Sequence, residues 1–408
     1  MMPPPARVLI VGGEASGDLY GGLLMRAMAG LERGIEFTGI GGPTMQAAGL
    51  RLLGDASQMG VTGLLEVAAR LPVIWRAYRA ARGAAAETQR PIDLAILIDY
   101  PDFNLRLAPY LHARGIPVLY FVSPQVWAWR RGRVKLIAKC VDRMLVILPF
   151  EQAFYRAAGV DVTFVGHPLL DLVRPERNRR QALSLLKLDP ARPTVALLPG
   201  SRGNEVRSLC AVMLAAARLL RDEFRDLQFV IPVAPTIDRT AIEAAVRAGG
   251  RWDAPPPLPV PEARYDAIAA CDAAVVASGT ATLECALLGV PMVITYRMNR
   301  LTFAMARRMS SVPHIGMPNL IAGREIVPEL MQGECRPDRI AAALRELLTD
   351  PARAATMRDD LSKVRARLGE PGSIDRAART AWGMIASRRE LAAAKTGSEP
   401  RAGGRGRR

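Results

Sequence analysis

The chain has 408 residues, of which half are hydrophobic and 5% are aromatic, and its formal net charge is +16 at pH 7. That length predicts two or three domains that each bury a core, and the composition is that of an ordinary α/β protein. No apolar run approaches the roughly 20 residues that span a bilayer, and the N-terminus passes directly into a strand pattern without a secretory segment, so we expect a cytoplasmic protein.

Part of the positive charge is concentrated at the C-terminus. From residue 386 onward seven basic residues stand against two acidic ones, which leaves +5 in that segment and +11 in the rest of the chain. A basic body suits nucleic acid, an anionic lipid surface or a phosphorylated substrate. A solvated basic face is the alternative.

Cysteine and histidine are few and scattered. The five cysteines include no C-x-x-C pair, and the histidines, His112, His167 and His314, are far apart. Zinc sites need ligands at short, regular spacings, so we expect no metal site. The cysteines are typical of reduced, buried thiols.

Short apolar runs alternate with amphipathic helical stretches, which predicts parallel sheets with helices on both faces. The expected strands of the first half are 7–13, 36–42, 94–100, 118–124, 143–149 and 162–168. Those of the second half are 194–201, 227–234, 273–279 and 292–297. The fold class that we expect is therefore α/β, with two doubly wound, Rossmann-like domains facing each other across a cleft.

The domain boundaries follow from the Pro and charge pattern. We expect an N-terminal domain over 1–175, a hinge near 175–190 and a second domain over 190–350. The helices at about 351–390 are expected to pack back on the first domain or on a neighbouring chain, which would make a homodimer. Residues 391–408, rich in Gly and Arg, are expected to form a disordered basic tail.

Neither half carries the dinucleotide-binding fingerprint. The loops VGGEASGD and LLPGSRGNEV do not satisfy G-x-G-x-x-G, which disfavours an NAD or FAD enzyme. In doubly wound sheets ligands bind beyond the carboxyl ends of the strands, so the loops at those ends are the candidate sites.

Acidic loops follow two strands of the first half. Asp99 ends a buried strand in ILIDYPDFN, where a carboxylate is well placed to act as a general base. The alternative is that Asp99 holds the turn and Asp102 caps the next helix. Glu14 and Ser16, in the opening loop GGEASGD, would also face the cleft, although a capped helix start explains them equally well.

A phosphate-suited loop follows the first strand of the second half. Gly200, Ser201 and Arg202 form a turn that leads into a helix, and the planar guanidinium of Arg matches phosphate oxygens. A surface ion pair between Arg202 and Glu205 is the alternative.

A second such loop, Ser278, Gly279 and Thr280, begins a helix whose first N–H groups and positive dipole end suit a diphosphate. Glu284 places a carboxylate one turn further into the same helix. The amide of Asn319, in MPNLIAGRE, is a third candidate for this site.

One subclass of phosphate chemistry has a signature that is missing here. No two aspartates stand two positions apart, as in the Asp-x-Asp pair of metal-dependent glycosyltransferases. The charge on a departing diphosphate would then be met by helix N-termini and cationic side chains.

These stretches together resemble the lipid A disaccharide synthases, a family of inverting, metal-independent glycosyltransferases with two Rossmann-like domains (the GT-B type). The resemblance runs from about residue 7 to 385. The motifs that carry it, in chain order, are GGEASGD, GIGGPTM, MGVTGLLEV, IDYPDFN, YFVSPQVWAWRRGRV, LPFE, FVGHPLLD, LLPGSRGNEV, ASGTATLECALLGVPMVI and MPNLIAGREIVPEL.

The resemblance implies a reaction that uses no cofactor. The 6-hydroxyl of 2,3-diacylglucosamine 1-phosphate (lipid X) would attack the anomeric carbon of UDP-2,3-diacylglucosamine, giving a β-1,6-linked disaccharide 1-phosphate and UDP. Asp99 would take the hydroxyl proton, and Arg202 with Asn319 would contact the diphosphate or the acceptor. The loop 278–280 would hold the phosphates, and Glu284 would accept hydrogen bonds from both ribose hydroxyls.

Lipid substrates imply contact with a bilayer. Segment 59–83 mixes apolar residues, Trp75 among them, with four arginines, which is typical of an interfacial helix on an anionic surface. We therefore expect peripheral association with the cytoplasmic face of the inner membrane, and a helix packed on the first sheet is the alternative. Trp127 would line an acyl or sugar pocket unless it belongs to the core.

Two rival functions stay open at this point. Another enzyme of the same fold, such as a UDP-N-acetylglucosamine 2-epimerase or a transferase with a different lipid acceptor, would share the phosphate loops. A polyanion-binding protein would use the basic body and tail, but it would have no use for Glu284 beside a phosphate loop. We expect no nucleic-acid partner.

Overall fold

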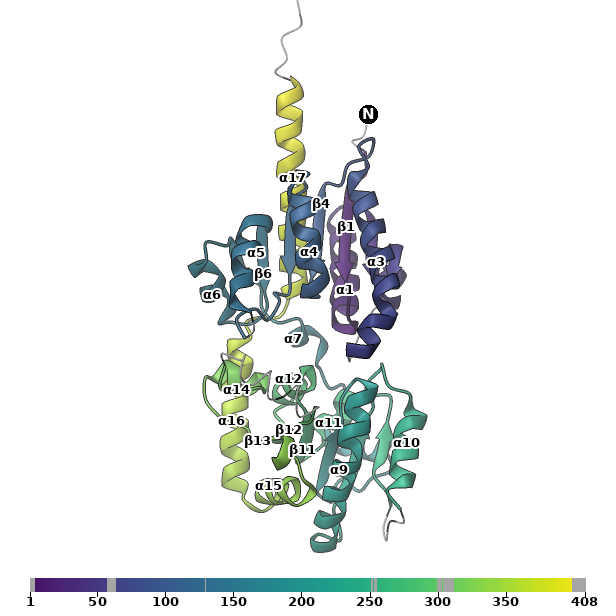
Figure 1. The fold of residues 1–408 in the computed structure, drawn as a ribbon. Coiled ribbons are helices and arrows are strands. Elements are labelled where there is room, and N and C mark those ends of the chain that lie inside the picture. The colour runs from purple at the N-terminus through teal and green to yellow at the C-terminus, as the bar shows by residue number, and fades with distance from the viewer. Residues whose placement is uncertain are drawn as a thin grey trace, which may run out of the picture.

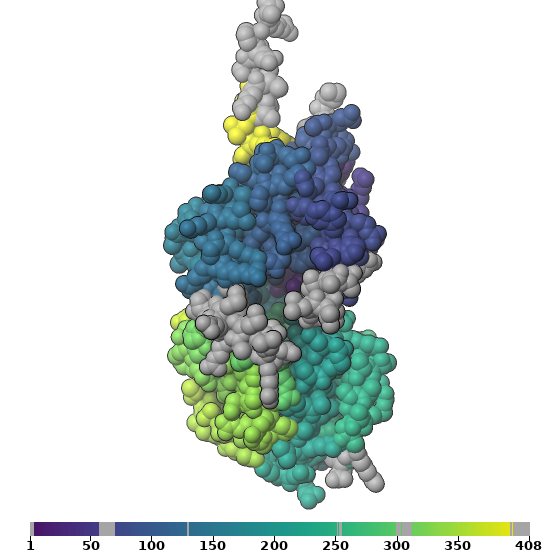
Figure 2. All heavy atoms as spheres, in the orientation of Figure 1, coloured from purple at the N-terminus to yellow at the C-terminus, as the bar shows by residue number. Residues whose placement is uncertain are grey.

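The computed structural model describes residues 4–56, 64–128, 130–250, 252, 255–298, 303 and 312–397. These residues form two parallel sheets, each covered by helices, and the two halves appear as two lobes in the space-filling view (Figure 1, Figure 2). The predicted α/β class with two doubly wound sheets is confirmed.

The first sheet has seven strands in the order β3-β2-β1-β4-β5-β6-β7. The strands are β1 (Arg7–Gly12), β2 (Glu36–Gly41), β3 (Arg51–Asp55), β4 (Leu94–Ile98), β5 (Val118–Phe121), β6 (Arg143–Val146) and β7 (Val162–Phe164). Every strand pair in it is parallel. The order reverses between β1 and β4, and this is the topological switch point of the sheet.

Helices cover both faces of this sheet because the side chains of its strands alternate in direction. Val8 and Ile10 of β1 belong to the core under α1 (Ala15–Leu31) and α17 (Ser373–Gly397). Leu9 and Val11 belong to the core under α3 (Leu64–Ala86), α4 (Pro101–His112) and α5 (Val134–Cys140). The short helices α2 (Pro43–Ala47) and α6 (Glu151–Ala157) complete this half.

The second sheet has six strands in the order β10-β9-β8-β11-β12-β13, again all parallel. The strands are β8 (Thr194–Leu198), β9 (Gln228–Pro232), β10 (Leu258–Val260), β11 (Ala273–Ala277), β12 (Met292–Tyr296) and β13 (Glu329–Met331). Its helices include α9 (Gly203–Glu223), α10 (Arg239–Ala248), α11 (Arg264–Ala269), α12 (Thr280–Leu287), α14 (Met317–Ala322) and α15 (Pro337–Thr349). The switch point lies between β8 and β11.

Three strands, β3, β10 and β13, were not predicted. All three are edge strands, and most of their residues are only partly buried, so they lack the continuous apolar run that marks the inner strands. The ten predicted strands are all present, most of them two or three residues shorter at the carboxyl end than expected. There the Gly, Pro and Ser residues leave the ladder and form the loops.

The region predicted as a hinge, 175–190, contains helix α8 (Arg179–Leu185). Helix α7 (Leu169–Leu172) lies just before it. Asn178 caps α8 in a reciprocal capping box with Gln181. Ala182 and Leu183 of α8 are buried against Ala270 of the second half. Part of the region predicted as a hinge is therefore helical, because the polar capping signal at Asn178 within the charge cluster starts α8.

The last two helices lie on different halves. Helix α16 (Pro351–Arg367) packs against α12, α14 and α15, whereas α17 packs against α1 and β4 (Figure 1). Helix α17 continues to Gly397, so residues 391–397 are helical rather than part of the tail. Residues 398–408 lie outside the described residues.

In the described part of the chain, none of the helices combines the length and the apolar content needed to cross a bilayer.

Candidate active site

The two switch points place four loops near the junction of the two halves. The loops after β1 and β4 carry Glu14 and Asp99, and the loop after β8 carries Arg202. Arg202 Nη2 lies 2.9 Å from Glu14 Oε2, so the two sheets meet through their carboxyl-end loops. This is the arrangement in which open α/β sheets bind ligands.

A pocket of about 160 Å³ lies at the switch point of the second sheet. It brings together the two loops that the sequence predicts for phosphate, Gly200 to Arg202 and Ser278 to Thr280, with Glu284. The remaining lining residues are Leu198, Glu205, Pro232, Ala234, Arg264, Ile268, Ala277 and Ala281. Seven predicted donor-site residues therefore share one pocket.

The loop after β11 opens this pocket at the start of α12. Gly279 has a φ of 152°, in the range that favours glycine, and a Cβ added there would meet open space. Thr282 Oγ1 donates to the Gly279 carbonyl at 2.7 Å, and Ser278 N–H donates to the Thr295 carbonyl at 2.9 Å. The turn is thus held from both sides while the start of α12 points its N–H groups toward the pocket.

The loop after β8 depends on a close approach between Gly200 and Glu205. Gly200 has a φ of 119°, and a Cβ there would lie 2.4 Å from Glu205 Oε2. That oxygen accepts the N–H groups of Ser201 at 3.0 Å and Arg202 at 3.3 Å. The Glu205 carboxylate therefore occupies the anion position at the start of α9.

Arg202 lies between two carboxylates. Its Nη1 is 3.2 Å from Glu205 Oε1, and its Nη2 binds Glu14. The ion pair with Glu205, which the sequence left as an alternative, is present together with a second pair that spans the two halves. Both pairs hold the guanidinium at the pocket rim.

Glu284 lies on the inner wall of the pocket and is buried. Its Oε1 accepts hydrogen bonds from Arg264 Nη2 and from the Tyr265 hydroxyl, the latter at 3.2 Å. Burial raises the pKa of the Glu284 carboxyl, and the Arg264 charge opposes that rise.

Arg264 was not predicted as a site residue. It is the first residue of α11, where a cation opposes the helix dipole, and its guanidinium also lies 4.6 Å from the centre of the Tyr265 ring. The one sequence signal for Arg264 was a basic residue at the start of a helix. Its partner, Glu284, is 20 positions away in the sequence, so no local pattern connects the two.

Asp99 lies where β4 turns into α4, with strained backbone on both sides. Asp99 and Tyr100 have consecutive left-handed φ angles of 43° and 46°. The Asp99 carbonyl accepts hydrogen bonds from the Tyr120 hydroxyl at 2.5 Å and from Asn104 Nδ2 at 2.8 Å. These bonds fix the turn. A Cβ on Gly13 would lie 2.2 Å from the Tyr100 ring, so the loops after β1 and β4 are in close contact.

The environment of Asp99 suits a base. Burial, and then the charge of Glu14, raises the pKa of its carboxyl from 3.8 to about 7. Asp102 is different, because its carboxylate is exposed and pairs with Arg133 at 2.6 Å. The two acids of ILIDYPDFN therefore have separate environments, and only Asp99 faces the junction.

The opening motif of the chain also fixes the loop that follows β2. The buried carboxylate of Asp18 accepts N–H groups from Gly42, Thr44 and Met45 at 2.7 to 2.9 Å. Glu14 precedes α1 without a side-chain cap bond, and its carboxylate is directed to Arg202 instead. Ser16 is half-buried in the first turn of α1.

Asn319, a predicted donor-site residue, does not line the pocket. It is completely buried, donates to the Val327 carbonyl and Glu329 Oε1, and accepts from the N–H groups of Ile326 and Val327. All four hydrogen-bonding positions of its amide are thus used between α14, which contains Asn319, and residues 326–329, so no group of the amide is free for the predicted contact with the diphosphate or acceptor.

Trp127 is a core residue. It is 5% exposed, stacks edge-on against Phe150, and its Nε1 donates to Glu151 Oε1 at 2.9 Å. Ser123 Oγ lies 2.5 Å from the same oxygen. The core interpretation of Trp127 replaces the prediction of an acyl or sugar pocket, because the indole N–H already has a buried acceptor.

Trp75 lies on the outer face of α3 and is 51% exposed, with its ring stacked on Tyr78 and beneath Arg79. Leu71, one turn earlier, is 53% exposed. Residues 59–63 of the predicted interfacial segment lie outside the described residues, as do the side chains of 64–69.

Among the described residues, no group of three or more His, Cys, Asp or Glu side chains is arranged to hold a metal ion.

Comparison with known proteins gives a consistent result. The family model described as lipid-A-disaccharide synthetase matches residues 8–381. The lipid-A-disaccharide synthase of Syntrophus aciditrophicus (strain SB) is 49% identical over 378 residues, covering 93% of this chain and 97% of the relative.

Solved structures with the same two-domain fold are more distant in sequence. A putative UDP-N-acetylglucosamine 2-epimerase from Listeria monocytogenes has a TM-score of 0.59 at 13% identity, covering 95% of this chain and 97% of that chain. The calicheamicin glycosyltransferase CalG4 has a TM-score of 0.56 at 16% identity, covering 95% and 100%. At these identities the likeness establishes the GT-B fold alone.

Proposed function

The chain belongs to the lipid-A-disaccharide synthase family and is a glycosyltransferase, and from this premise we propose how its residues carry out the reaction. The donor is UDP-2,3-diacylglucosamine and the acceptor is 2,3-diacylglucosamine 1-phosphate (lipid X). The products are a β-1,6-linked disaccharide 1-phosphate and UDP. The observation that carries the proposal is the Arg202–Glu14 contact, which joins the donor pocket of one half to the loop beside Asp99 in the other.

The donor diphosphate binds between the loop Gly200 to Arg202 and the start of α12. N–H groups and the helix dipole at Gly279 and Thr280 meet its negative charge, as at other anion sites on helix N-termini. The Glu205 carboxylate, which holds the Ser201 and Arg202 N–H groups in this structure, is displaced when the diphosphate arrives. Both anions compete for the same donors.

The ribose lies against Glu284. Because Arg264 and Tyr265 both donate to Oε1, Oε2 is the oxygen that accepts from the ribose hydroxyls. The Arg264 charge opposes the rise that burial gives to the pKa of Glu284 and so favours the ionised carboxylate, which is the acceptor that two hydroxyls need.

Asp99 is the general base for the acceptor 6-hydroxyl. Its pKa near 7 means that a large fraction is ionised at neutral pH while the carboxylate stays basic enough to take a proton. As the C–O bond to UDP breaks, Arg202 and the two helix starts stabilise the charge on the leaving diphosphate. Glu14 releases Arg202 toward that charge and then lies beside the acceptor.

The lipid chains bring the enzyme to a membrane surface. Exposed Leu71 and Trp75 on α3, with Arg79 over the Trp75 ring, suit peripheral binding to the anionic cytoplasmic face of the inner membrane. Helix α17 packs on α1 of its own chain. A homodimer stays a prediction, which sedimentation velocity of the full chain tests.

The reaction is tested by mass spectrometry of the products formed from UDP-diacylglucosamine and lipid X in the presence of EDTA. We expect the tetraacyl disaccharide 1-phosphate and UDP at a rate that the chelator does not change. Absence of the disaccharide in both the presence and the absence of EDTA contradicts the proposed reaction. A rate that falls with chelation contradicts the role given to Arg202 and the helix starts as the sole counter-charge.

A further inference from the structure

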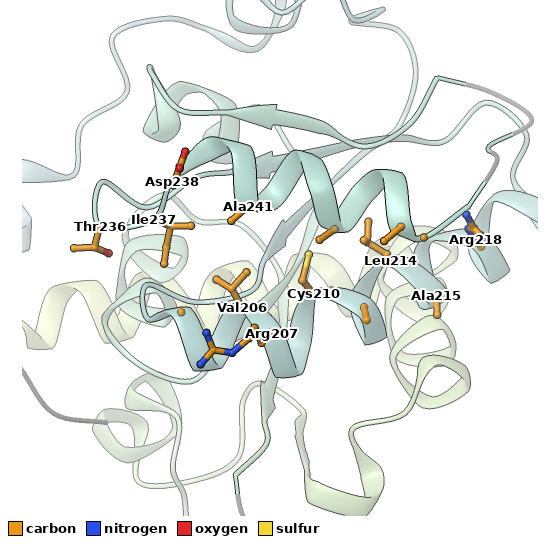
Figure 3. A pocket seen from close by; sticks show the side chains of 15 residues that line it. Val206, Arg207, Cys210, Leu214, Ala215, Arg218, Thr236, Ile237, Asp238 and Ala241 are labelled. Carbon is orange, nitrogen blue, oxygen red and sulfur yellow. The ribbon is translucent and has the colours of Figure 1, made fainter. Parts of the chain in front are cut away.

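A long groove lies between α9 and α10, on the outer face of the second sheet (Figure 3). Its volume is about 750 Å³, several times that of the donor pocket. The lining side chains are mostly small and apolar: Val206, Cys210, Ala211, Leu214 and Ala215 from α9, and Ile237, Ala241, Ala245 and Ala248 from the α10 side. The established chemistry uses none of them.

The groove is deep because both helices turn small residues toward it. Cys210 and Leu214 are buried at its floor, and Ala215 and Ala245 are half-buried on facing walls. Ala side chains leave the space between two adjacent helices unfilled. A cavity with such a lining attracts apolar groups rather than ordered water, which needs polar partners.

One end of the groove adjoins the donor pocket. Gly203, at this end, directly follows Arg202 of the pocket, and the Thr236 hydroxyl donates to the Ser201 carbonyl at 2.6 Å. Both helices follow parallel strands, so their N-terminal ends lie at the carboxyl edge of the sheet, where the donor binds. Because Arg202 and Gly203 are consecutive, the donor pocket and the groove are neighbours at this end.

The other end of the groove is lined by Arg218 and Gly249. The Arg218 guanidinium lies 4.6 Å from the centre of the Trp252 ring, beside Gly249 at the end of α10. From Gly203 to Arg218 the groove runs along about four turns of α9, or roughly 22 Å by helix rise. A largely apolar groove of this length, with one end next to the donor pocket, suits an acyl chain.

We propose that this groove binds one acyl chain of the donor sugar nucleotide. The inference rests on the proposed function, because it needs a donor that carries acyl chains. The donor is favoured over the acceptor because its diphosphate is anchored in the same half of the molecule. Burial of the acyl chain in the groove then contributes part of the free energy of donor binding. The length of the groove sets the acyl-chain length that the enzyme prefers.

The location of the bound acyl chain is tested with a donor that carries a photoreactive diazirine at the end of one acyl chain. After irradiation of the full-length enzyme, peptide mass spectrometry should find the label on residues 206–218 of α9 or 237–248 of α10. Excess unlabelled donor should suppress it. Labelling of α3 alone would place the chain at the membrane face and overturn the inference.

The energetic part is tested with a groove-blocking substitution, Ala215→Trp, or Ala245→Trp on the opposite wall. Ala244→Trp is the matched control, because Ala244 is exposed on α10 and does not line the groove. For the unmodified enzyme, each methylene added to a short-chain, water-dissolved donor should raise kcat/KM by up to about fourfold while the groove fills. The control should keep this dependence, and the blocked variants should lose it.

The outcomes separate this inference from the reaction itself. If the unmodified enzyme forms no disaccharide from any donor, the proposed function fails. If it forms disaccharide but the blocked variants keep the full dependence on chain length, the groove is not the acyl site. UDP affinity, measured by calorimetry, should be unchanged in both blocked variants and shows that their donor pocket is folded.

Discussion

Arg202 of the second half and Glu14 of the first form an ion pair, with 2.9 Å between Nη2 and Oε2. The two residues are 188 positions apart in the sequence, and no other side-chain contact described above joins the two switch-point loops. Because Glu14 also raises the pKa of Asp99, one carboxylate links the cation at the donor pocket to the proposed base. The predictions below follow from this linkage.

Replacing Arg202 should slow the chemical step. We expect Arg202→Ala to lower kcat by about 10²–10³-fold, the effect of losing one preorganised donor to a developing oxyanion. Arg202→Lys should lose less, because it keeps the charge but not the planar fork. The measurement is steady-state turnover with saturating donor, and Arg239→Ala, an exposed arginine on α10, is the control. A kcat within twofold of the original for Arg202→Ala contradicts the role.

Asp99 should set the pH dependence. The ionised form is the base, so kcat/KM should rise with pH to a plateau, with a midpoint at about 7. Asp99→Asn should remove the dependence and lower kcat by about 10²–10⁴-fold. Asp102→Asn changes an exposed carboxylate and should leave the profile intact. An unchanged midpoint in Asp99→Asn would show that another group is titrating.

The same residue makes a prediction for stability. The pKa of Asp99 is raised in the folded state, so the folded protein keeps a proton that the unfolded chain releases. Its contribution is fully present below pH 3.8 and is lost as the pH rises through about 7. Asp99→Asn should therefore raise the thermal midpoint at pH 8 by about 2–4 °C, while activity falls. Equal thermal midpoints for Asp99→Asn and the unmodified protein at pH 8 would contradict the burial of the ionised Asp99 carboxylate.

Glu14→Gln tests the linkage between the two halves. Removing this negative charge should lower the pKa of Asp99, so the midpoint of the kcat/KM profile should move to lower pH. Glu36→Gln, which changes an exposed carboxylate paired with Arg90, should leave the midpoint unchanged. A shift to higher pH, or the same shift in the control, rules out direct coupling between Glu14 and Asp99.

The extent to which these residues could be predicted depends on whether a signal is local. Asp99, Arg202 and Gly279 each follow a buried strand, and parallel strands bring their carboxyl ends to one edge, so local pattern and topology were enough. Arg264 was missed because its partner comes from another helix. Asn319 was misplaced because its amide, on α14, can turn outward or inward, and the choice depends on a carbonyl, a carboxylate and N–H groups seven to ten positions away.

The same limit applies to the fold. Inner strands such as β4 and β11 are completely buried and carry an unbroken apolar run, whereas the edge strand β13 does not. Trp127 has no local pattern that separates a pocket from a core. Contacts from later residues, the Phe150 ring and the buried Glu151 carboxylate, hold it in the core.

Glu284 should govern nucleotide binding. Glu284→Gln keeps the shape of the side chain but weakens its acceptor strength, and we expect the Kd for UDP to rise by about 10–100-fold, the effect of losing hydrogen bonds to a charged acceptor. Glu223→Gln, an exposed glutamate paired with Arg345, is the control. Isothermal titration calorimetry measures the Kd for UDP in each protein. An equal Kd in Glu284→Gln and the unmodified protein would show that the ribose does not contact Glu284.

The exposed face of α3 should govern membrane binding. Leu71 and Trp75 are 53% and 51% exposed, and moving either side chain from water into the lipid interface contributes about 1.5–3 kcal/mol. Leu71→Ser with Trp75→Ser should therefore reduce binding to anionic vesicles by at least about tenfold, measured by co-sedimentation. Turnover of a water-dissolved short-chain donor should not change. Leu185→Ser, at a leucine that is 58% exposed on α8, is the matched control, and an equal loss of vesicle binding in this variant would show that α3 is not the membrane-binding face.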